Sequence, residues 1–421
     1  MDAPPTVPDD VVELEVGAIA AGGGCVGRAP DGRVVFVRHS LPGERVRARV
    51  TAEASSFLRA DAVEVLEASA DRVEPVCPHA GPGRCGGCDF QHVSAGAQRR
   101  LKEDLVAEQL ARVGGVDLRV EVEDVGGAPG GLGWRTRVAF GVDAGGTVGL
   151  HRHRSHDLEP VEHCPLASAG VTAAGVGTVR WPGARRLEVS ASPDGGDAVV
   201  LVDTGKQRMD GLPDVDAGIV WKGRTLRAPD HVTTEVHGHR FVVGAGVFWQ
   251  VHPRAAEVLT DAVLDGLSPR PGERVADLYA GAGLFTVALA RAVGPTGVVV
   301  AVERSGPAVG DLARNTQGMG QVEVVRGDVR PGLVARRLGR PELVVLDPAR
   351  AGAGREVVGA LCALDPAPRR IAYVSCEPAP FARDLRQFLA AGWRLGSLRA
   401  LDLFPMTEHV ELVAVLERPG A

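Results

Sequence analysis

The chain has 421 residues, which is too long for one ordinary domain, so two or three domains are expected. Its hydrophobic content of 45% is enough for packed cores, and no apolar run is long enough to span a bilayer. A formal net charge of −6 does not by itself indicate a nucleic-acid partner, although a local basic surface would suffice to bind one.

The first ten residues are acidic and proline-rich, and they lack the basic and apolar regions of a secretory signal. We therefore expect a disordered start over residues 1–10 and a cytoplasmic protein. Seven cysteines are too few for a disulfide scaffold in a chain of this length, and their clustering points to a metal site instead.

Short segments of alternating apolar and polar residues fill residues 11–70, with glycine-containing turns at residues 22–24, 31–32 and 42–43. This pattern predicts a small antiparallel, OB-like β-barrel. The segment resembles a TRAM domain, an OB-like RNA-binding module, through residues 23–28 (GGCVGR) and 36–44 (FVRHSLPGE). The resemblance favours RNA binding over a barrel without a ligand.

Residues 71–255 mix the two kinds of periodicity. Leu and Val recur at helical spacing over residues 94–113, with Ser94 as a candidate N-cap and Gly114-Gly115 as the stop. Strand-like runs follow at residues 136–142 and 198–202. We predict an α+β central domain.

Four cysteines stand out in this central region: Cys77, Cys85, Cys88 and, much later, Cys164. Three thiols in a glycine-rich loop plus a distant fourth can bind zinc or an iron-sulfur cluster, and the spacing alone does not choose between them. Buried thiols without a ligand are the weaker alternative for a Cys-x-x-Cys in a loop. The Cys-x3-Cys-x2-Cys pattern of radical enzymes is absent.

From residue 256 to residue 421, short buried strands alternate with helical stretches, which predicts a Rossmann-like α/β domain with a parallel sheet. Ligands of such sheets bind at the carboxyl ends of the strands. Asp277, Glu303, Asp347 and Cys376 all fall at predicted strand ends.

The turn Asp277-Leu-Tyr-Ala-Gly281-Ala-Gly283 joins a strand to a helix, and its glycines would let the backbone approach a cofactor closely. Taken alone, this motif also fits dinucleotide enzymes. The later sequence Asp347-Pro-Ala-Arg350 favours S-adenosylmethionine over NAD.

Two motifs near the end supply a thiol and a carboxylate: Cys376 within residues 373–378 (YVSCEP) and Glu411 within residues 407–411 (TEHVE). The C5 carbon of uracil becomes nucleophilic only after a thiolate has attacked C6, and a base must later remove the C5 proton. With these motifs in this order, the chain resembles the RNA uracil-C5 methyltransferases over nearly its whole length.

The resemblance implies roles for particular residues. Cys376 would be the nucleophile and Glu411 the general base. The residues that would bind S-adenosylmethionine are Gln250, Tyr279, Gly281, Gly283, Glu303, Asp328 and Asp347. The residues that would hold a 4Fe-4S cluster, as in the ribosomal branch of the family, are Cys77, Cys85, Cys88 and Cys164. The chain departs from the family pattern at His252, Leu284 and Glu377, where asparagine is usual.

The expected function is therefore S-adenosylmethionine-dependent C5-methylation of a uridine in RNA. The TRAM-like module and the cysteine cluster together favour 23S rRNA as the substrate. A tRNA substrate is the alternative within the family. Cytosine-C5 methyltransferases use a different cysteine pair, one preceded by proline, which this chain lacks. The alternative of another class is a catalytically silent RNA-binding protein. RNA is the implied partner, and neither a membrane nor a protein partner is implied.

Overall fold

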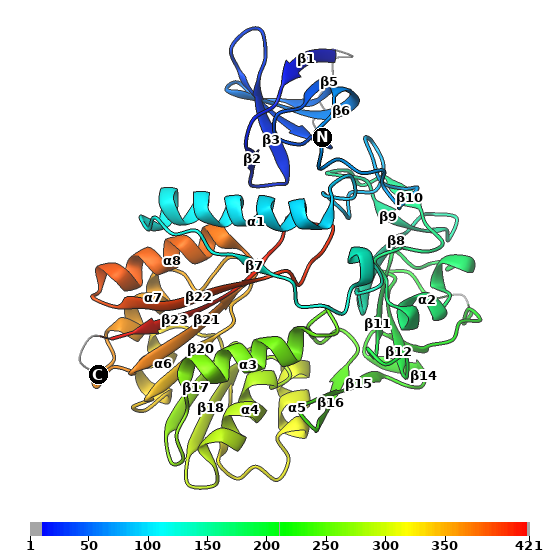
Figure 1. The fold of residues 1–421 in the computed structure, drawn as a ribbon. Coiled ribbons are helices and arrows are strands. Elements are labelled where there is room, and N and C mark those ends of the chain that lie inside the picture. Colours follow the sequence, from blue (N-terminus) through cyan, green and yellow to red (C-terminus); the bar gives the residue numbers. More distant parts are fainter. Residues whose placement is uncertain (1–10, 210, 419–421) are drawn as a thin grey trace.

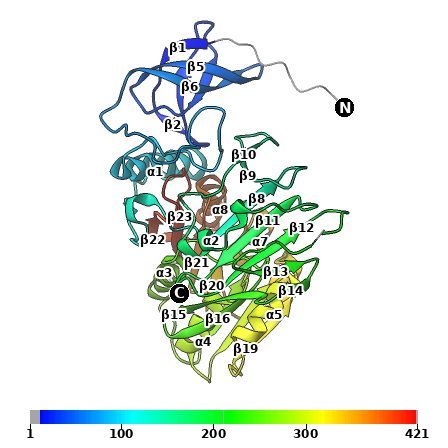
Figure 2. The ribbon, with the colours of Figure 1, turned by 90° about the vertical axis from the view of Figure 1, so that its right-hand side faces the viewer.

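The computed structural model describes residues 11–209 and 211–418, so the predicted disordered start over residues 1–10 lies outside the described residues. Figures 1 and 2 show the barrel resting on helix α1, with a central β-sheet beside it and the C-terminal α/β unit below. Within the described ranges, none of the helices has the length and apolar character needed to cross a membrane.

The N-terminal unit is a six-stranded sheet in the order β1-β5-β6-β4-β3-β2. Backbone bonds from Gly17 N to Val26 O (2.7 Å) and from Val26 N to Ala18 O (2.9 Å) join its edges into a barrel. The prediction of an entirely antiparallel barrel is wrong at one pair of strands. β6 is antiparallel to β5 on one side but parallel to β4 on the other. The strands are β1 (Val11–Glu15), β2 (Ile19–Ala20), β3 (Gly24–Arg28), β4 (Val34–Arg38), β5 (Arg45–Glu53) and β6 (Phe57–Glu67).

The central unit is a seven-stranded sheet in the order β10-β9-β8-β11-β12-β13-β14, with helix α2 (Ala169–Ala173) and a core around Trp181 and Leu187. Most neighbours are antiparallel, but β12 and β13 are parallel, so the sheet is mixed. Its strands are β8 (Arg137–Val142), β9 (Val148–His151), β10 (Leu158–Pro160), β11 (Arg186–Ala191), β12 (Ala198–Asp203), β13 (Gly218–Trp221) and β14 (Arg224–Arg227).

The C-terminal sheet has the order β19-β18-β17-β20-β21-β23-β22-β7, in which β23 runs antiparallel to both neighbours. Apolar clusters cover both faces, one formed with α6, α7 and α8 and the other with α3 and α4. This arrangement confirms the predicted Rossmann-like α/β fold. The elements are α3 (Ala255–Leu267), β17 (Arg274–Leu278), α4 (Leu284–Val293), β18 (Val298–Glu303), α5 (Gly306–Asn315), β19 (Val322–Arg326), α6 (Pro331–Arg337), β20 (Leu343–Leu346), α7 (Arg355–Cys362), β21 (Arg370–Ser375), α8 (Pro378–Ala390), β22 (Arg394–Leu401) and β23 (Glu411–Glu417).

Two segments from the stretch 71–255 attach to this C-terminal sheet. Strand β7 (Val122–Glu123) extends it by pairing in parallel with β22. The hairpin of β15 (His231–Val236) and β16 (His239–Gly244) packs on α5, where Gly244 N donates to Asp311 Oδ2 at 2.7 Å. The C-terminal α/β unit therefore includes two segments from the residues before 256: strand β7 and the β15–β16 hairpin.

Helix α1 (Ala95–Gln109) begins after Ser94 and continues as a wider turn to Gly114, which confirms the predicted helix. Its Lys102 is fully buried, and Lys102 Nζ donates to Asp402 Oδ1 at 2.6 Å and to Phe404 O at 3.0 Å. Gln98 Oε1 accepts from Met406 N at 2.8 Å. These contacts fix residues 402–410, which we call the 402–410 loop, and it leads directly to Glu411.

Replacing Lys102 with Met should lower the free energy of unfolding by about 3–5 kcal/mol, because Asp402 would stay buried without its partner. The measurement is urea unfolding followed by tryptophan fluorescence. Arg99→Ala is the matched control, since its ion pair with Asp124 is much more exposed and should contribute at most about 1 kcal/mol. Wild-type stability in Lys102→Met would show that the pair does not hold the loop.

Candidate functional site

The carboxyl ends of the parallel strands gather several of the predicted residues at one edge of the C-terminal sheet. β17 pairs with β18 on one side and with β20 on the other. The turn after β17, the last residue of β18 and the first residue after β20 therefore lie side by side. They carry Gly281, Glu303 and Asp347 respectively.

The turn after β17 is held in a tight conformation by Glu303. Gly281 N donates to Glu303 Oε2 at 3.0 Å, and Ser305 N donates to Oε1 at 2.6 Å. Gly281 and Gly283 have φ values of 55° and 97°, and a Cβ on Gly283 would lie 2.7 Å from Leu312 Cδ1. Tyr279 also has a positive φ, 68°, which is uncommon for a residue with a side chain. Leu312 fills the space beside Gly283, whereas nothing lies within 4 Å of a Cβ placed on Gly281, so a ligand could approach the backbone of the turn at Gly281.

Two aspartates lie below this turn. Asp277 is fully buried and accepts from Thr286 Oγ1 at 2.5 Å, while its Oδ1 has no hydrogen-bond partner among the described residues. Burial raises the pKa of Asp277 to about 6. Burial and then the charge of Asp277 raise the pKa of Asp347 to about 7. The sequence motif contained Asp277, but the family resemblance did not assign it a contact.

Gln250 and Asp328 have different surroundings. Asp328 follows β19 beside Glu303, since Gly327 N donates to Glu303 O at 2.9 Å, and it pairs with Arg304 and Arg330. Gln250 precedes Val251, whose carbonyl accepts from the backbone and hydroxyl of Thr136 at 2.9 Å. Within the described residues, no hydrogen bond or ion pair connects Gln250 to the other predicted cofactor residues.

Cys376 and Glu411 are brought together by the register of two antiparallel strands. Ser375 at the end of β21 pairs with Leu412 of β23, so the next position of the ladder places Cys376 across from Glu411. Cys376 is half-buried and Glu411 is buried. These residues are far apart in the sequence, and the structure places them at the edge that also carries Asp347.

The electrostatics of this pair are dominated by burial and by like charge. Burial, then Glu411 and Glu377, raise the pKa of the Cys376 thiol to about 12, and Arg350 acts in the opposite direction. Burial, then Asp347 and Glu377, raise the pKa of Glu411 well above its usual range. A carboxylate with a raised pKa is a stronger base once it is ionised.

Arg350, Glu377 and His409 form a cluster beside the thiol. Arg350 Nη1 and His409 Nδ1 each lie 3.6 Å from Glu377 Oε1, and Arg350 Nη2 is 3.4 Å from His409 Nε2. Burial, then Arg350, lower the pKa of His409 to about 4, so its ring is neutral at pH 7. The guanidinium is the cation nearest to the thiol in this cluster.

The loop that carries Arg350 is fixed by Asp384 of α8. Asp384 is fully buried and accepts from Tyr373 Oη at 2.8 Å and from Gly354 N at 3.0 Å. Arg383 Nη2 donates to Ala351 O at 2.9 Å. These bonds hold the segment after Asp347 in a defined position relative to β21 and therefore to Cys376.

The four clustered cysteines Cys77, Cys85, Cys88 and Cys164 line one cavity between the cysteine loop (residues 77–92) and the central unit. Burial raises the pKa of Cys85 to about 11 and that of Cys88 to about 12. Among the described residues, no three His, Cys, Asp or Glu side chains are close enough together to hold a single metal ion. The thiols are thus gathered around one space without forming the compact set that one ion requires.

The sequence analysis missed the residues that hold the 402–410 loop. Besides Lys102 and Gln98, the barrel and the cysteine loop also contact the 402–410 loop. From the barrel, Gly22 N donates to Glu408 Oε2. From the cysteine loop, Asp89 N and Phe90 N both donate to Met406 O, at 3.0 Å in each case. The local signal was present, because Gln98 and Lys102 are polar side chains on the apolar face of the predicted helix. Their partners lie about 300 residues further on and left no local pattern.

Comparisons with known proteins agree with this arrangement. The family model for the TRAM domain matches residues 9–63. An uncharacterized RNA methyltransferase of Streptomyces coelicolor is 47% identical over 426 residues, which cover 96% of this chain and 92% of that protein. One from Bifidobacterium longum is 35% identical over 432 residues, covering 96% of each. The crystal structure of Pyrococcus abyssi tRNA (uracil-54, C5)-methyltransferase with S-adenosyl-L-homocysteine shares the fold, with a TM-score of 0.72, 22% identity and coverage of 96% and 99%.

Glu377→Gln should lower the pKa of Cys376, because it removes a like charge and releases Arg350 from its partner. A larger thiolate fraction at pH 8 should speed alkylation of Cys376 by iodoacetamide, by up to about tenfold for a difference of 1.4 kcal/mol. Mass spectrometry of the peptide containing Cys376 gives the rate. Exposed Glu356→Gln is the control and should react like the wild type. An unchanged or slower rate in Glu377→Gln would contradict the assigned electrostatics.

Proposed function

Because the chain belongs to the family of RNA methyltransferases that these relatives represent, we propose that it methylates C5 of a uridine in RNA, with S-adenosylmethionine as the methyl donor. The observation that carries this proposal is the register of β21 and β23, which sets a thiol across from a buried carboxylate at the ligand-binding edge of the sheet.

The proposed donor fits the turn after β17 and the strands beside it. Gly281 leaves the backbone open to a ligand, and Glu303 stands where ribose hydroxyls are bound in folds of this kind. The methyl-bearing sulfonium is a cation, and the half-buried carboxyl of Asp347 and the unpartnered Oδ1 of Asp277 offer it complementary charge. We assign supporting contacts to Tyr279, Asp328 and Gln250. When bound, the donor supplies the methyl group to C5.

The thiol begins the reaction. Cys376 Sγ loses its proton to solvent and attacks C6 of the uracil, forming an S–C6 bond while the C5–C6 double bond opens toward an enolate at C4. The enolate makes C5 nucleophilic, and C5 takes the methyl group as the bond between that methyl and the donor's sulfur breaks, with S-adenosylhomocysteine as the leaving group. Arg350 is the cation available to offset the negative charge that develops beside Cys376.

Glu411 completes the cycle. Its carboxylate removes the remaining proton from C5, the electron pair re-forms the C5–C6 double bond, and the S–C6 bond breaks to release the Cys376 thiolate. The raised pKa of Glu411 suits this step, because a carboxylate in a buried, negatively charged site accepts a proton readily. The target base must leave its stack to reach these two residues, which costs less in an RNA loop than in a duplex.

We propose 23S rRNA as the substrate and tRNA as the second candidate. The cysteine loop, which resembles that of the ribosomal branch, supports the first. The fold shared with a tRNA-modifying enzyme supports the second. Mass spectrometry of nucleosides from rRNA and tRNA of a deletion strain separates them, since only the true substrate loses 5-methyluridine.

We also propose that Cys77, Cys85, Cys88 and Cys164 hold a 4Fe-4S cluster. All four line one cavity, as a cluster with four thiolate ligands requires. A zinc ion held by the same four thiolates is the alternative, and the metal content of the purified protein separates the two. The cluster would join the cysteine loop to the central unit through Cys164.

Cys376→Ala should abolish methylation and any covalent adduct with RNA, because no thiolate remains to attack C6. Glu411→Gln should still allow attack and methyl transfer but fail to remove the C5 proton, since an amide is a poor base. A denaturing gel of Glu411→Gln with RNA and S-adenosylmethionine should then show a protein–RNA band that Cys376→Ala lacks. RNA containing 5-fluorouridine should trap the wild-type enzyme in the same way.

Activity in Cys376→Ala would refute the covalent mechanism. So would the absence of any adduct with fluorouridine RNA, because fluorine cannot leave C5 as a cation and the intermediate should persist.

Protein purified without oxygen should contain close to four irons and four acid-labile sulfides per chain and absorb near 400 nm. Cys88→Ser should lose both iron and colour, whereas Cys362→Ser, on α7 outside the cluster cavity, should keep them. Colourless protein with one zinc per chain would contradict the iron-sulfur assignment.

A further inference from the structure

The barrel carries an aromatic pair and an arginine on its outer surface. Val35 and Leu58 belong to the barrel core, so the residues next to them along β4 and β6, Phe36, Phe57 and Arg59, face outward. All three are partly exposed. The two rings lie edge to face with their centroids 5.7 Å apart, and the guanidinium carbon of Arg59 is 5.8 Å and 5.2 Å from the two centroids. We call these three side chains the stacking platform.

The guanidinium of the stacking platform has no acidic partner. Within the described part of the chain, Arg59 forms neither an ion pair nor a side-chain hydrogen bond, whereas Arg47 on β5 of the same barrel pairs with Glu64 at 2.8 Å. Burial, then the charge of Arg154, lower the pKa of Arg59. An arginine that is stacked on rings and lacks a carboxylate keeps its donors available to an anionic ligand.

A second arginine of this kind comes from the central unit. Arg154 is exposed at the tip of the β9–β10 hairpin, and it too makes no ion pair among residues 11–209 and 211–418. Its φ is 52°, which is uncommon for a residue with a side chain. The turn around it is fixed, since Arg152 N donates to Asp157 O at 2.9 Å and Ser155 N donates to Arg152 O at 3.1 Å. The hairpin therefore presents Arg154 in a defined position.

The cysteine loop holds the tip of this hairpin. Cys85 forms an antiparallel bridge with Arg152, and Gly86 N donates to His151 O at 3.0 Å. A Cβ on Gly86 would lie 2.7 Å from the Cα of His153, so this close approach requires glycine. The hairpin tip and the cysteine loop are thus packed backbone to backbone.

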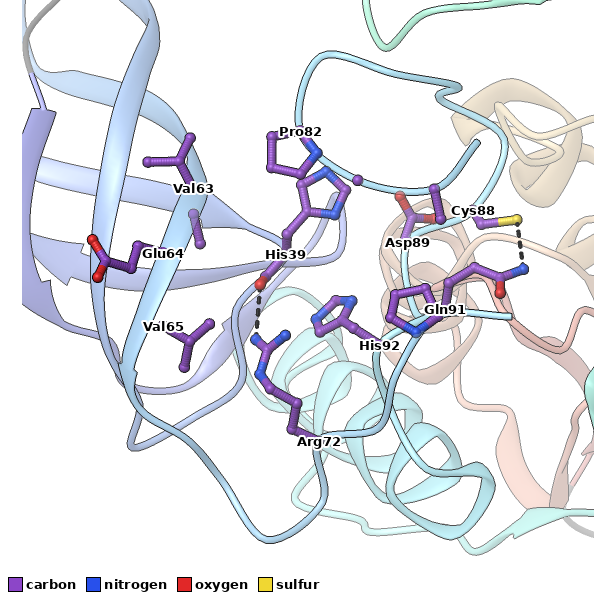
Figure 3. Close-up of a pocket in the computed structure, with 14 residues that line it drawn as sticks. His39, Val63, Glu64, Val65, Arg72, Pro82, Cys88, Asp89, Gln91 and His92 are labelled. Carbon is purple, nitrogen blue, oxygen red and sulfur yellow. Dashed lines mark hydrogen bonds between the residues drawn. The ribbon is translucent and has the colours of Figure 1, made fainter. Parts of the chain in front are cut away.

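The same loop packs against the barrel on its other side. Figure 3 shows Pro82 of the cysteine loop next to the imidazole of His39, which follows β4. Asp89 of the loop pairs with Arg38 at the end of β4, and both side chains are largely buried. Figures 1 and 2 both show the β9–β10 hairpin below the barrel. The cysteine loop therefore joins the outer face of the barrel and the hairpin tip into one surface.

We propose that the stacking platform and the hairpin tip form one binding surface for an unpaired segment of the substrate RNA, apart from the methylated uridine. Bases that have left their stack bind to aromatic rings and to guanidinium planes, both of which the platform offers. Arg59 and Arg154 would contact phosphates of the same strand. A duplex keeps its bases stacked on one another and could use only the two charges. None of the residues assigned to the uridine or to the methyl donor belongs to this surface.

The proposal rests on the proposed RNA substrate and gives the cysteine loop a part in binding it. The loop contacts no RNA in this scheme. It sets the distance between the platform and Arg154, so that both engage one strand.

The test is fluorescence anisotropy of a labelled single-stranded RNA of about 12 nucleotides, a length within the site sizes of OB folds, with the full-length protein. Phe57→Leu keeps apolar volume but removes a flat ring, so it should weaken binding roughly fivefold or more, as expected for one base–aromatic stack. Arg154→Ala should weaken binding and reduce the salt slope by about 0.7, the value for one phosphate of a single strand. Arg47→Ala, which removes an exposed arginine already paired with Glu64, is the matched control and should bind like the wild type.

Circular dichroism verifies the fold of each variant, and the exposed Arg154→Ala decides the matter if Phe57→Leu fails to fold. Equal affinities in wild type and in folded variants would overturn the proposal. So would equal affinity of the wild type for a duplex of the same strand. Binding of inorganic polyphosphate that falls as much in Phe57→Leu as binding of RNA would also contradict a base on the platform, in favour of a general anion surface.

Methylation of RNA is assayed on the same wild-type sample, which separates this proposal from the proposed function. Methylation together with unchanged RNA affinity in the variants would defeat the surface and leave the proposed function standing. Reduced affinity in the variants of a protein that does not methylate RNA would defeat the proposed function and leave the surface standing.

Discussion

The buried ion pair between Lys102 and Asp402 is the interaction on which the position of the proposed catalytic residue Glu411 depends. A charge inside the protein is tolerated only when its partner is fixed, so the pair admits one position of the loop relative to α1. The same loop receives hydrogen bonds from the barrel at Gly22 and from the cysteine loop at Asp89. Three separate stretches of chain thus converge on the segment before Glu411, so residues of the N-terminal third of the molecule position the proposed base.

Excess negative charge is the second constraint at this edge. In addition to burial, the charge of Asp277 raises the pKa of Asp347, and the charges of Asp347 and Glu377 raise the pKa of Glu411. Arg350 opposes these charges at Glu377 and at the Cys376 thiol. Such a site disfavours a thiolate in its resting state while making its carboxylates strong bases. It also attracts a cationic ligand. A thiol whose pKa is raised in this way is mostly protonated at pH 7, and the protonated thiol is a weak nucleophile.

Local sequence patterns predicted the helix at α1, the barrel and the parallel strands, because periodicity reports on neighbours in the chain. The sequence motifs identified the thiol of Cys376 and the carboxylate of Glu411. Only the structure shows the register of β21 and β23, which places the two residues across from each other. Strand β7 could not be predicted, since two residues become a strand only by pairing with β22. The contact of the β15–β16 hairpin with α5 and the buried Lys102 are of the same kind: each is decided by a partner far along the chain.

The pairing of β7 with β22 sets an order of events during synthesis. Val122 meets Ala400, about 280 residues later in the chain. At 5–20 residues per second, a ribosome needs roughly 15–55 s to deliver that partner. Throughout this interval the side of the α1 helix that carries Val106 and Leu110 has no sheet to cover, whereas Leu101 and Leu105 pack on residues of the barrel and the cysteine loop that are already synthesised. For most of its elongation the nascent chain therefore exposes unpaired backbone at residues 122–123 and an uncovered apolar side of the helix, the kind of surface that promotes aggregation of incomplete chains.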